Sequence, residues 1–515
     1  MNMKTIYKFA VISLLTGGMF ASCAEEKLET NPTSSMSGST LMGNASTALV
    51  PLNGIYRTFW TYDNSETFGP LSYAFMNDMM AEDMVLGDGG SGWFEWDVLY
   101  RHKNYFTSTG ERSYNLWNNH YTWISNANYI LAAEETMQGD KNDVNYVIGQ
   151  AYAIRAFSYF MLAQHFARTL VGHESEACVP IYTEPTTPET KGKPRATNAE
   201  VYAQIDNDIN KAVALLKGTS QKHISHISYA VALGLKARIA MVENKWAEAK
   251  DAAHEAIAAS GAKILHAADF SGVNDVTKAN VMWGLQIKSD QKTGYASYFA
   301  HMDTLYYGKN AYKQINKLLY AKMNPTDERI NWWNPSPNSP YNVTNDAGEV
   351  ISGYIQNKFH FLSAQDMTGD YILMRVEEMY LTAAEAECQL GDEAAAKADL
   401  MELMSVRDPG YTCDKTGKAL GKTSNEETGS LLEEIITQRR IELWGEFGRC
   451  YDLKRLHQGF RRTEEQGWQT GSYRLSNKPT DNPENFMWIF LLPQTEFDGN
   501  ENLTLEKDQN PMTDE

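Results

Sequence analysis

Two glycine-rich stretches come closest to a nucleotide-binding pattern, and neither completes it. Residues 87–92 have the GxGxxG spacing of a dinucleotide-binding loop, but such a loop must follow a strand and open a helix, and residues 93–97 do not read as a helix start. In residues 417–423, three residues separate the glycines where a phosphate-binding loop requires four. Both stretches are therefore interpreted as ordinary polar loops.

Metal ligands and nucleophiles also lack a recognisable arrangement. His223 and His226 could hold a metal ion, but no third ligand is evident, which favours helix capping or solvent exposure. Neither GxSxG nor HExxH occurs. Four cysteines form no CxxC pair and are interpreted mainly as small buried residues: Cys178, Cys388, Cys413 and Cys450. The sequence thus identifies no catalytic residue, metal or cofactor, although it leaves open a glycosidase, which needs only two carboxylates about 5–10 Å apart.

The chemistry that remains is binding by aromatic side chains. Aromatic residues make up 11% of the chain, and three stretches rich in Gly, Pro, Asn and aromatics show no regular periodicity: 63–113, 265–368 and 459–487. Loops on a rigid scaffold often carry binding residues, and aromatic rings offer flat faces to sugars or peptides. Packing in the core is the competing interpretation for every one of these rings.

Composition restricts the possible partners. The chain has 515 residues, 43% hydrophobic and 22% charged, with a formal charge of −19. These values describe a folded protein and exclude disordered, collagenous and multi-span membrane classes. The acidic balance, without any block of Lys or Arg, argues against a surface for nucleic acid.

Helical periodicity recurs along the chain and must position these loops. Apolar residues step by three and four through residues 117–131, and further helices are expected at 147–166 and 202–216. Residues 230–261 and 377–409 share small residues at matching positions, as in the helix pairs of tetratricopeptide repeats. We predict an all-α fold of tetratricopeptide-like helix pairs, interrupted by long loop-rich insertions.

The most distinctive segment is the charged helix predicted over residues 435–455. On one continuous helix, residues three apart face each other. This spacing predicts a structural network of three ion pairs: Arg439 with Glu442, Glu446 with Arg449, and Arg449 with Asp452. A catalytic use of these charges is disfavoured because arginine is a poor proton shuttle.

The N-terminus has the features of an export signal. Two lysines precede an apolar run of about a dozen residues, which is too short to span a bilayer core of about 30 Å. The run ends in Phe20-Ala21-Ser22-Cys23, which resembles the lipobox of bacterial lipoproteins. We expect cleavage of residues 1–22, lipidation of Cys23, and a flexible tether over residues 23–47. The acidic start of this tether resembles the signal that sends lipoproteins of the Bacteroidota to the cell surface.

The chain resembles the SusD/RagB family. Its residues 438–455 match the family's arginine-rich helix, which runs through Glu-Leu, Glu-x-x-Arg and Asp-Leu-x-Arg, with Gln438 where Glu is commoner. Other matches follow the family's order along the chain: Leu28-x-Thr30-x-Pro32, Trp117-x3-Tyr121-x2-Ile124-x3-Asn128, Arg155-Ala156-Phe157-x-Tyr159-Phe160, Arg375-x-Glu377-x2-Tyr380-Leu381-x2-Ala384-Glu385-Ala386, Leu492-Pro493-Gln494-x-Glu496 and Gln509-Asn510-Pro511.

This resemblance implies one helical domain over residues 48–515, with an N-terminal part of about 48–310 and a C-terminal part of about 311–515. It implies a non-enzymatic lipoprotein on the outer face of the outer membrane. Such proteins form a lid on a SusC-type TonB-dependent transporter and bind glycans, or in some cases peptides, for import. A purely structural lid and, less favoured, a surface glycoside hydrolase remain the alternatives.

The resemblance also orders the aromatic candidates. Trp93 and Trp96 come first as stacking platforms, because family members often build ligand pockets in the insertion before the helix that holds Trp117. Trp332, Trp333 and Tyr341 come next. Polar neighbours that could orient sugar hydroxyls are Asp88, Glu95, Asp97 and Asn334.

Overall fold

The computed structural model describes residues 41–60, 63, 66–87, 94–99, 111–291, 294–333, 338–344, 348–351, 353–469 and 481–512. The predictions for the signal peptide, Cys23, most of the tether, Trp93, Asp88 and Asn334 lie outside these residues.

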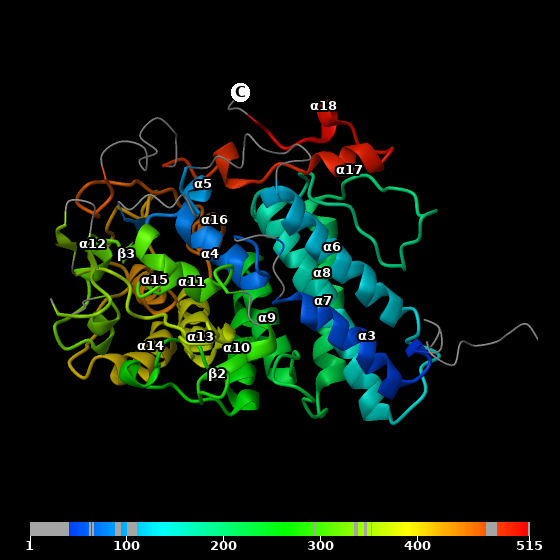
Figure 1. Cartoon of the computed structure of the whole chain (residues 1–515), viewed down its shortest axis with the longest axis horizontal. Helices are drawn as coiled ribbons and strands as arrows, with labels where there is room; N and C mark the ends of the chain where they lie inside the picture. The colour runs from blue at the N-terminus through cyan, green and yellow to red at the C-terminus, as the bar shows by residue number, and fades with distance from the viewer. Residues whose placement is uncertain are drawn as a thin grey trace, which may run out of the picture.

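The described helices are α3 (Ala45–Thr58), α4 (Pro70–Met80), α5 (Glu95–Val98), α6 (Glu111–Leu131), α7 (Lys141–Phe166), α8 (Asn198–Leu216), α9 (Tyr229–Val242), α10 (Trp246–Ser260), α11 (Tyr298–Met302), α12 (Lys317–Tyr320), α13 (Val376–Leu390), α14 (Glu393–Arg407), α15 (Leu431–Glu442), α16 (Arg449–Arg455), α17 (Gln494–Gly499) and α18 (Leu505–Asp508). Short 3₁₀ helices are η3 (Ala267–Asp269), η4 (Ser289–Gln291), η5 (Tyr307–Ala311), η6 (Glu328–Trp332) and η7 (Phe486–Trp488). The prediction of a mostly helical fold is confirmed (Figure 1).

Helix α7 is the central element of the N-terminal half. Every residue from Tyr146 to Phe166 is buried, and α6 and α8 pack against it. Its Arg155 joins all three helices, because the guanidinium donates two hydrogen bonds of 2.7 Å to Asp208 on α8 and one of 2.7 Å to Asn128 on α6. Because α7 is apolar on nearly all sides, neighbouring elements must cover it on every side.

The two predicted repeats are the helix pairs α9–α10 and α13–α14. The small residues that define them, including Ala237, Ala253 and Ala384, are fully buried. Although the pairs are distant in sequence, α10 packs directly against α13, so they form one continuous array (Figure 1). Close packing of helices requires small side chains at the contact, as the repeat pattern predicted.

Three two-stranded antiparallel sheets connect the insertions within the described residues. The strands are β1 (Met84–Leu86) with β3 (Lys313–Ile315), β2 (Val281–Leu285) with β6 (Tyr371–Arg375), and β4 (Val343–Thr344) with β5 (Val350–Ile351). The first of these sheets brings the insertion before α6 to the segment that follows α11.

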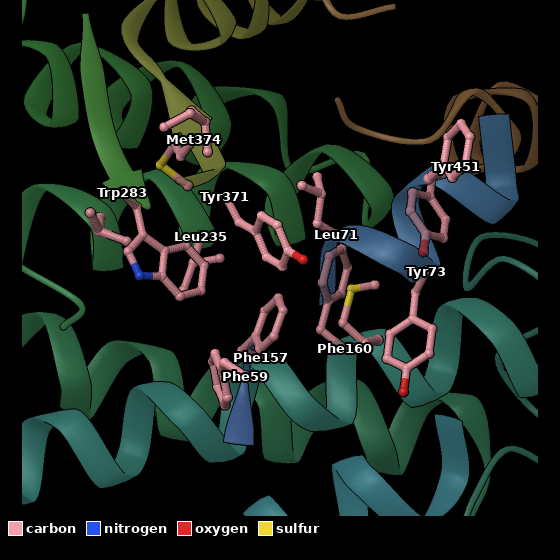
Figure 2. Packing of buried hydrophobic residues seen from close by; sticks show 14 of the residues in the cluster. Phe59, Leu71, Tyr73, Phe157, Phe160, Leu235, Trp283, Tyr371, Met374 and Tyr451 are labelled. Atoms are coloured by element: carbon pink, nitrogen blue, oxygen red, sulfur yellow. The ribbon is translucent and has the colours of Figure 1, made fainter. Parts of the chain in front are cut away.

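The main core lies where α4, α7 and α9 meet strand β2. Figure 2 shows Phe157 of α7 close to Phe59 and Trp283. The rings of Phe157 and Trp283 lie edge to face at 5.6 Å, an arrangement that aromatic pairs favour. Helix α4 was not predicted, because all of its residues are buried and it therefore lacks the polar face that produces a periodic pattern.

The charged segment forms two helices, which corrects the expected pairing. Helix α15 ends at Glu442, and the backbone reverses through Gly445 and Gly448, whose φ angles are +81° and +100°. This break separates Glu446 from Arg449, whereas the other two expected pairs keep their helical spacing on α15 and α16 but take other partners. Glycine accommodates such angles without steric cost, unlike residues with a Cβ atom.

Four of the five charged residues are buried, Glu446 is partly buried, and all five pair mainly with distant elements. Arg439 contacts Asp452 (2.9 Å), and Arg449 contacts Glu82 (3.2 Å). Glu446 accepts a bond of 2.6 Å from Arg375. The segment is therefore a structural ion-pair network, but its partners are not the ones that helical spacing predicted.

Glu442 is the centre of this network. Its fully buried carboxylate accepts hydrogen bonds from Arg407 (2.9 Å), Arg375 (3.1 Å) and Arg329 (3.4 Å). Burial alone would raise the pKa of Glu442, but the three guanidinium groups outweigh burial and hold the pKa well below its usual value.

We expect Glu442→Gln to lower the free energy of unfolding by about 3 kcal/mol or more, because it leaves buried guanidinium groups uncompensated. Urea denaturation at pH 7 measures this change through the transition midpoint. The matched control is Glu402→Gln at an exposed position on α14, which should change stability by less than about 0.5 kcal/mol. Equal effects of the two substitutions would contradict a central role for Glu442.

Candidate ligand-binding surface

Helix α5 presents Trp96 from a firmly anchored segment. Phe94, the residue that precedes α5, is fully buried and lies edge to face on His301 of α11, with ring centroids 5.0 Å apart. Asp97 is also buried and receives two hydrogen bonds from Arg112 of α6, at 2.8 and 3.2 Å. Trp96 between them is half-buried. Asp97 therefore fixes α5 and is not available to a ligand.

Burial raises the pKa of Asp97 to about 6, and the charge of Arg112 opposes this shift. Arg112 also contacts Glu66, whose carboxylate accepts a hydrogen bond of 2.7 Å from the backbone N–H of Phe94. Three segments are thus joined at the base of α5.

Two exposed aromatic rings lie on the segments that flank helix α11, the second of them at the start of η5. All five residues of α11 are buried, whereas Tyr295 before it and Tyr307 after it are 52% and 42% exposed. Their ring centroids are 6.0 Å apart at an interplanar angle of 65°. We call Tyr295 and Tyr307 the tyrosine pair. A short buried helix thus holds two large rings against solvent at a fixed separation.

The rest of the molecule fixes α11 on both sides. Figure 1 places α11 beside α15 and close to α4. The Tyr298 hydroxyl donates a hydrogen bond of 2.6 Å to the Gly445 carbonyl after α15, and its ring meets Phe75 of α4 at 5.5 Å. The tyrosine pair therefore stands on the same framework as the Glu442 network.

Tyr341 lies close to the same segment. Thr304 donates a hydrogen bond of 2.8 Å from its Oγ1 to the Tyr341 carbonyl. The half-buried Tyr341 ring packs on His360, with ring centroids 4.0 Å apart. The structure thus brings Trp96 and Tyr341 onto segments that contact α11 or the turn after it.

Trp332 and Trp333 belong to the core. Trp332 is 4% exposed and stacks on Phe270, and Trp333 is fully buried against Trp444. Neither ring offers a face to a soluble ligand. Both residues lie in the predicted irregular stretch, but at 3₁₀ helix η6 both rings are buried, with Trp332 beside Arg407 of the Glu442 network.

The sequence did not single out the tyrosine pair. Both residues lie in the predicted irregular stretch 265–368, yet so does Tyr298, which is buried. Nothing in the local sequence separates these tyrosines, because their exposure depends on what packs over α11. The one available sequence signal was that both tyrosines lie in an aromatic-rich insertion.

A second aromatic groove lies along α6. Tyr114, Trp117 and Tyr121 line it with Tyr182 and Glu496. Most of its polar groups already have internal partners: the Trp117 Nε1 donates to Glu496 (3.2 Å), and the Tyr121 hydroxyl donates to the Pro180 carbonyl (2.7 Å). The polar groups of Trp117 and Tyr121 are therefore engaged within the protein.

The histidines that could have held a metal serve the structure instead. His226 is buried, and its two nitrogens contact the Tyr146 hydroxyl (2.7 Å) and Asn53 Oδ1 (2.9 Å). Burial, followed by the nearby His223, lowers the pKa of His226 to about 4. The Nδ1 of His223 accepts a hydrogen bond from the Ser225 backbone N–H (3.1 Å). Neither histidine caps a helix, because the N-cap of α9 is Ser228; His223 is exposed, in agreement with the alternative interpretation.

One cluster within the described ranges brings three potential metal ligands together, on α10, α13 and α14: His254, Glu387 and Asp399. His254 Nε2 lies 2.7 Å from Asp399 and 3.8 Å from Glu387. Burial, and next the charge of Asp399, raises the pKa of Glu387 to about 7, while His254 opposes this shift. The candidate ligand atoms of the three side chains all lie within 4.8 Å of one another.

The raised pKa of Glu387 predicts a pH-dependent contribution to stability. Between the unfolded pKa of about 4.3 and the folded value of about 7, the folded state binds more protons, so this contribution falls as the pH rises through that window. We expect Glu387→Gln to change the free energy of unfolding more favourably at pH 8 than at pH 4.5, by on the order of 1 kcal/mol. Thermal unfolding at both pH values measures this difference, and Glu402→Gln should show none.

Comparison with known proteins identifies the family. Residues 72–241 match a family model described as SusD-like, "Starch-binding associating with outer membrane", and residues 278–512 match the model of the SusD family. The two matches follow one another along most of the chain. The protein belongs to the SusD/RagB family.

Individual relatives share this architecture. The chain is 24% identical over 397 residues to "SusD-like protein P38" of Formosa agariphila, covering 69% of this chain and 74% of that protein. A SusD-like carbohydrate binding protein from Bacteroides vulgatus superimposes with a TM-score of 0.74 at 26% identity, covering 90% of this chain and 97% of that one. Surface glycan-binding protein A from Bacteroides thetaiotaomicron shares the fold, with a TM-score of 0.67 at 16% identity, covering 92% of this chain and 100% of that one.

No helix in the described part of the chain is both long and apolar enough to cross a membrane.

Proposed function

We propose that this protein is a non-catalytic, cell-surface lipoprotein that binds a nutrient glycan and delivers it to a SusC-type TonB-dependent transporter. The exposed tyrosine pair carries this proposal. Two rings 6.0 Å apart on a rigid base are suited to the apolar faces of sugar rings. Such binding requires no catalytic group.

The family supports the proposal independently. One of its models is described as starch-binding and outer-membrane associating, and relatives of the same fold are described as carbohydrate binding or glycan-binding. The lipobox-like sequence that ends in Cys23 provides the attachment to the membrane. In this arrangement, the lipid holds the protein at the outer surface and the helical array forms the scaffold that meets the transporter.

Glycan-array and calorimetric measurements on the mature chain test the proposal. We expect Tyr295→Ala and Tyr307→Ala each to weaken binding of the recognised glycan about fivefold to tenfold, since aromatic contacts of this kind are worth about 1 kcal/mol. Trp93→Ala and Trp96→Ala test the neighbouring insertion in the same way. The matched control is Tyr129→Ala, which removes a 41% exposed tyrosine on α6 and should leave affinity unchanged.

Other binding results would point to another site or another class of ligand. Binding that survives the Tyr295, Tyr307, Trp93 and Trp96 substitutions would overturn this site and direct attention to the groove along α6. Failure to bind any glycan would overturn glycan recognition in favour of a peptide ligand or a lid that contacts only the transporter.

A further inference from the structure

A concave, positively charged surface lies between α3, the connection from α8 to α9, and the segment that follows β2. It encloses about 480 Å³. We call it the basic hollow and define it by six of its lining residues: Arg57, Trp60, Lys222, Gln286, Lys288 and Gln291. It is separate from both the tyrosine pair and the groove along α6.

The charge of the basic hollow is opposite to that of the whole protein. The chain carries a formal charge of −19, yet the residues that line the hollow include two lysines and one arginine and no Asp or Glu. Lys222 pairs with Asp143. Among the described residues, no carboxylate lies within ion-pair distance of Arg57 or Lys288, and Asp290 does not line the hollow. Two cations therefore face the hollow without a counter-ion from the described protein.

The floor of the hollow is rigid and neutral. Tyr56 and His226 stack there at 4.5 Å, and the Tyr56 hydroxyl is bonded to Gln150 of α7. His226 is uncharged at neutral pH, because its pKa is about 4. The positive charge thus comes from the rim, above a preformed base, so that binding an anion requires no reorganisation of the floor.

The other lining groups suit a sugar better than a simple ion. Gln286 and Gln291 supply amides that can both donate to and accept from hydroxyl groups. Trp60 is half-buried and supplies an indole ring. Cations for an acidic substituent, amides for hydroxyl groups and an aromatic ring together match a sugar that carries a carboxylate or a sulfate.

The hollow and the tyrosine pair are close enough for one oligosaccharide. Gln291 and Tyr295 are four residues apart, so their Cα atoms are separated by at most about 14 Å. We propose that the basic hollow binds the anionic group of an acidic glycan, a uronate carboxylate or a sulfate ester, while neighbouring sugars of the same chain contact the tyrosine pair. This inference rests on the proposed function and specifies its substrate class.

Calorimetry with matched charged and neutral glycans tests the inference on the mature chain. The probes are oligogalacturonate with its methyl ester, hyaluronan oligosaccharides with their methyl ester, and sulfated galactan oligosaccharides with their desulfated form. We expect at least one acidic probe to bind about tenfold or more tightly than its neutral partner, as charge-assisted hydrogen bonds imply. The uronate and sulfate pairs distinguish the two sources of charge.

Variants in the hollow locate the binding. We expect Arg57→Ala and Lys288→Ala each to weaken binding of the acidic probe about tenfold and to leave binding of its neutral partner unchanged. We expect Lys288→Arg to retain most of the affinity for the acidic probe. The matched control is Lys191→Ala, because the Lys191 side chain is 85% exposed on the insertion before α8. Raising the salt concentration should weaken the acidic probe more than its neutral partner.

The failures of the two proposals are distinguishable. Glycan binding that depends on Tyr295 but shows no preference for charge would overturn the acidic-glycan inference and leave the proposed function intact. A charge preference that survives both Arg57→Ala and Lys288→Ala would overturn the assignment to the basic hollow. Absence of binding to every acidic probe by a chain that binds another glycan on the array would overturn the acidic-glycan inference alone, whereas failure to bind any glycan would overturn both.

Discussion

The buried carboxylate of Glu442 is the interaction on which the C-terminal half of this protein depends. An isolated ion in a protein interior is strongly unfavourable, and here three arginines from η6, β6 and α14 neutralise it together. Each arginine is itself buried, so removing any member leaves an uncompensated charge. The network therefore fixes elements that are distant in sequence in one relative arrangement.

That arrangement extends to the surface. Where α15 ends, Lys358 donates hydrogen bonds to the carbonyls of Glu442 (2.7 Å) and Trp444 (3.0 Å), and the Gly445 carbonyl accepts the bond from Tyr298 of α11. A Cβ atom on Gly445 would lie 2.6 Å from the Phe359 ring, so this turn requires glycine both for its positive φ and for space. The tyrosine pair thus stands on a helix held by the interior, whereas the loops around it can vary without disturbing the scaffold.

Prediction from sequence succeeded where a regular pattern carried the signal. The small residues of the repeats predicted the helix pairs α9–α10 and α13–α14, because close helix packing selects such residues at fixed spacing. It failed for α4, whose residues are all buried and show no period. It also misjudged Trp332 and Trp333, because an irregular stretch can be core as readily as loop. Of the ring candidates that the structure describes, Trp96 and Tyr341 lie on segments that contact α11 or the turn after it.

Four features could be predicted from the sequence alone, because each depends on residues close together in the chain: the family resemblance, the helical scaffold, the expected lipid attachment at Cys23 and the absence of a recognisable catalytic motif. The folded structure was needed to establish which charges pair, which aromatic rings face solvent and where positive charge collects on an acidic protein. Glu442 at the end of α15 meets arginines from three other elements. The same folding exposes Tyr295 and Tyr307 and groups Arg57 with Lys288, relations between distant residues that no local spacing encodes.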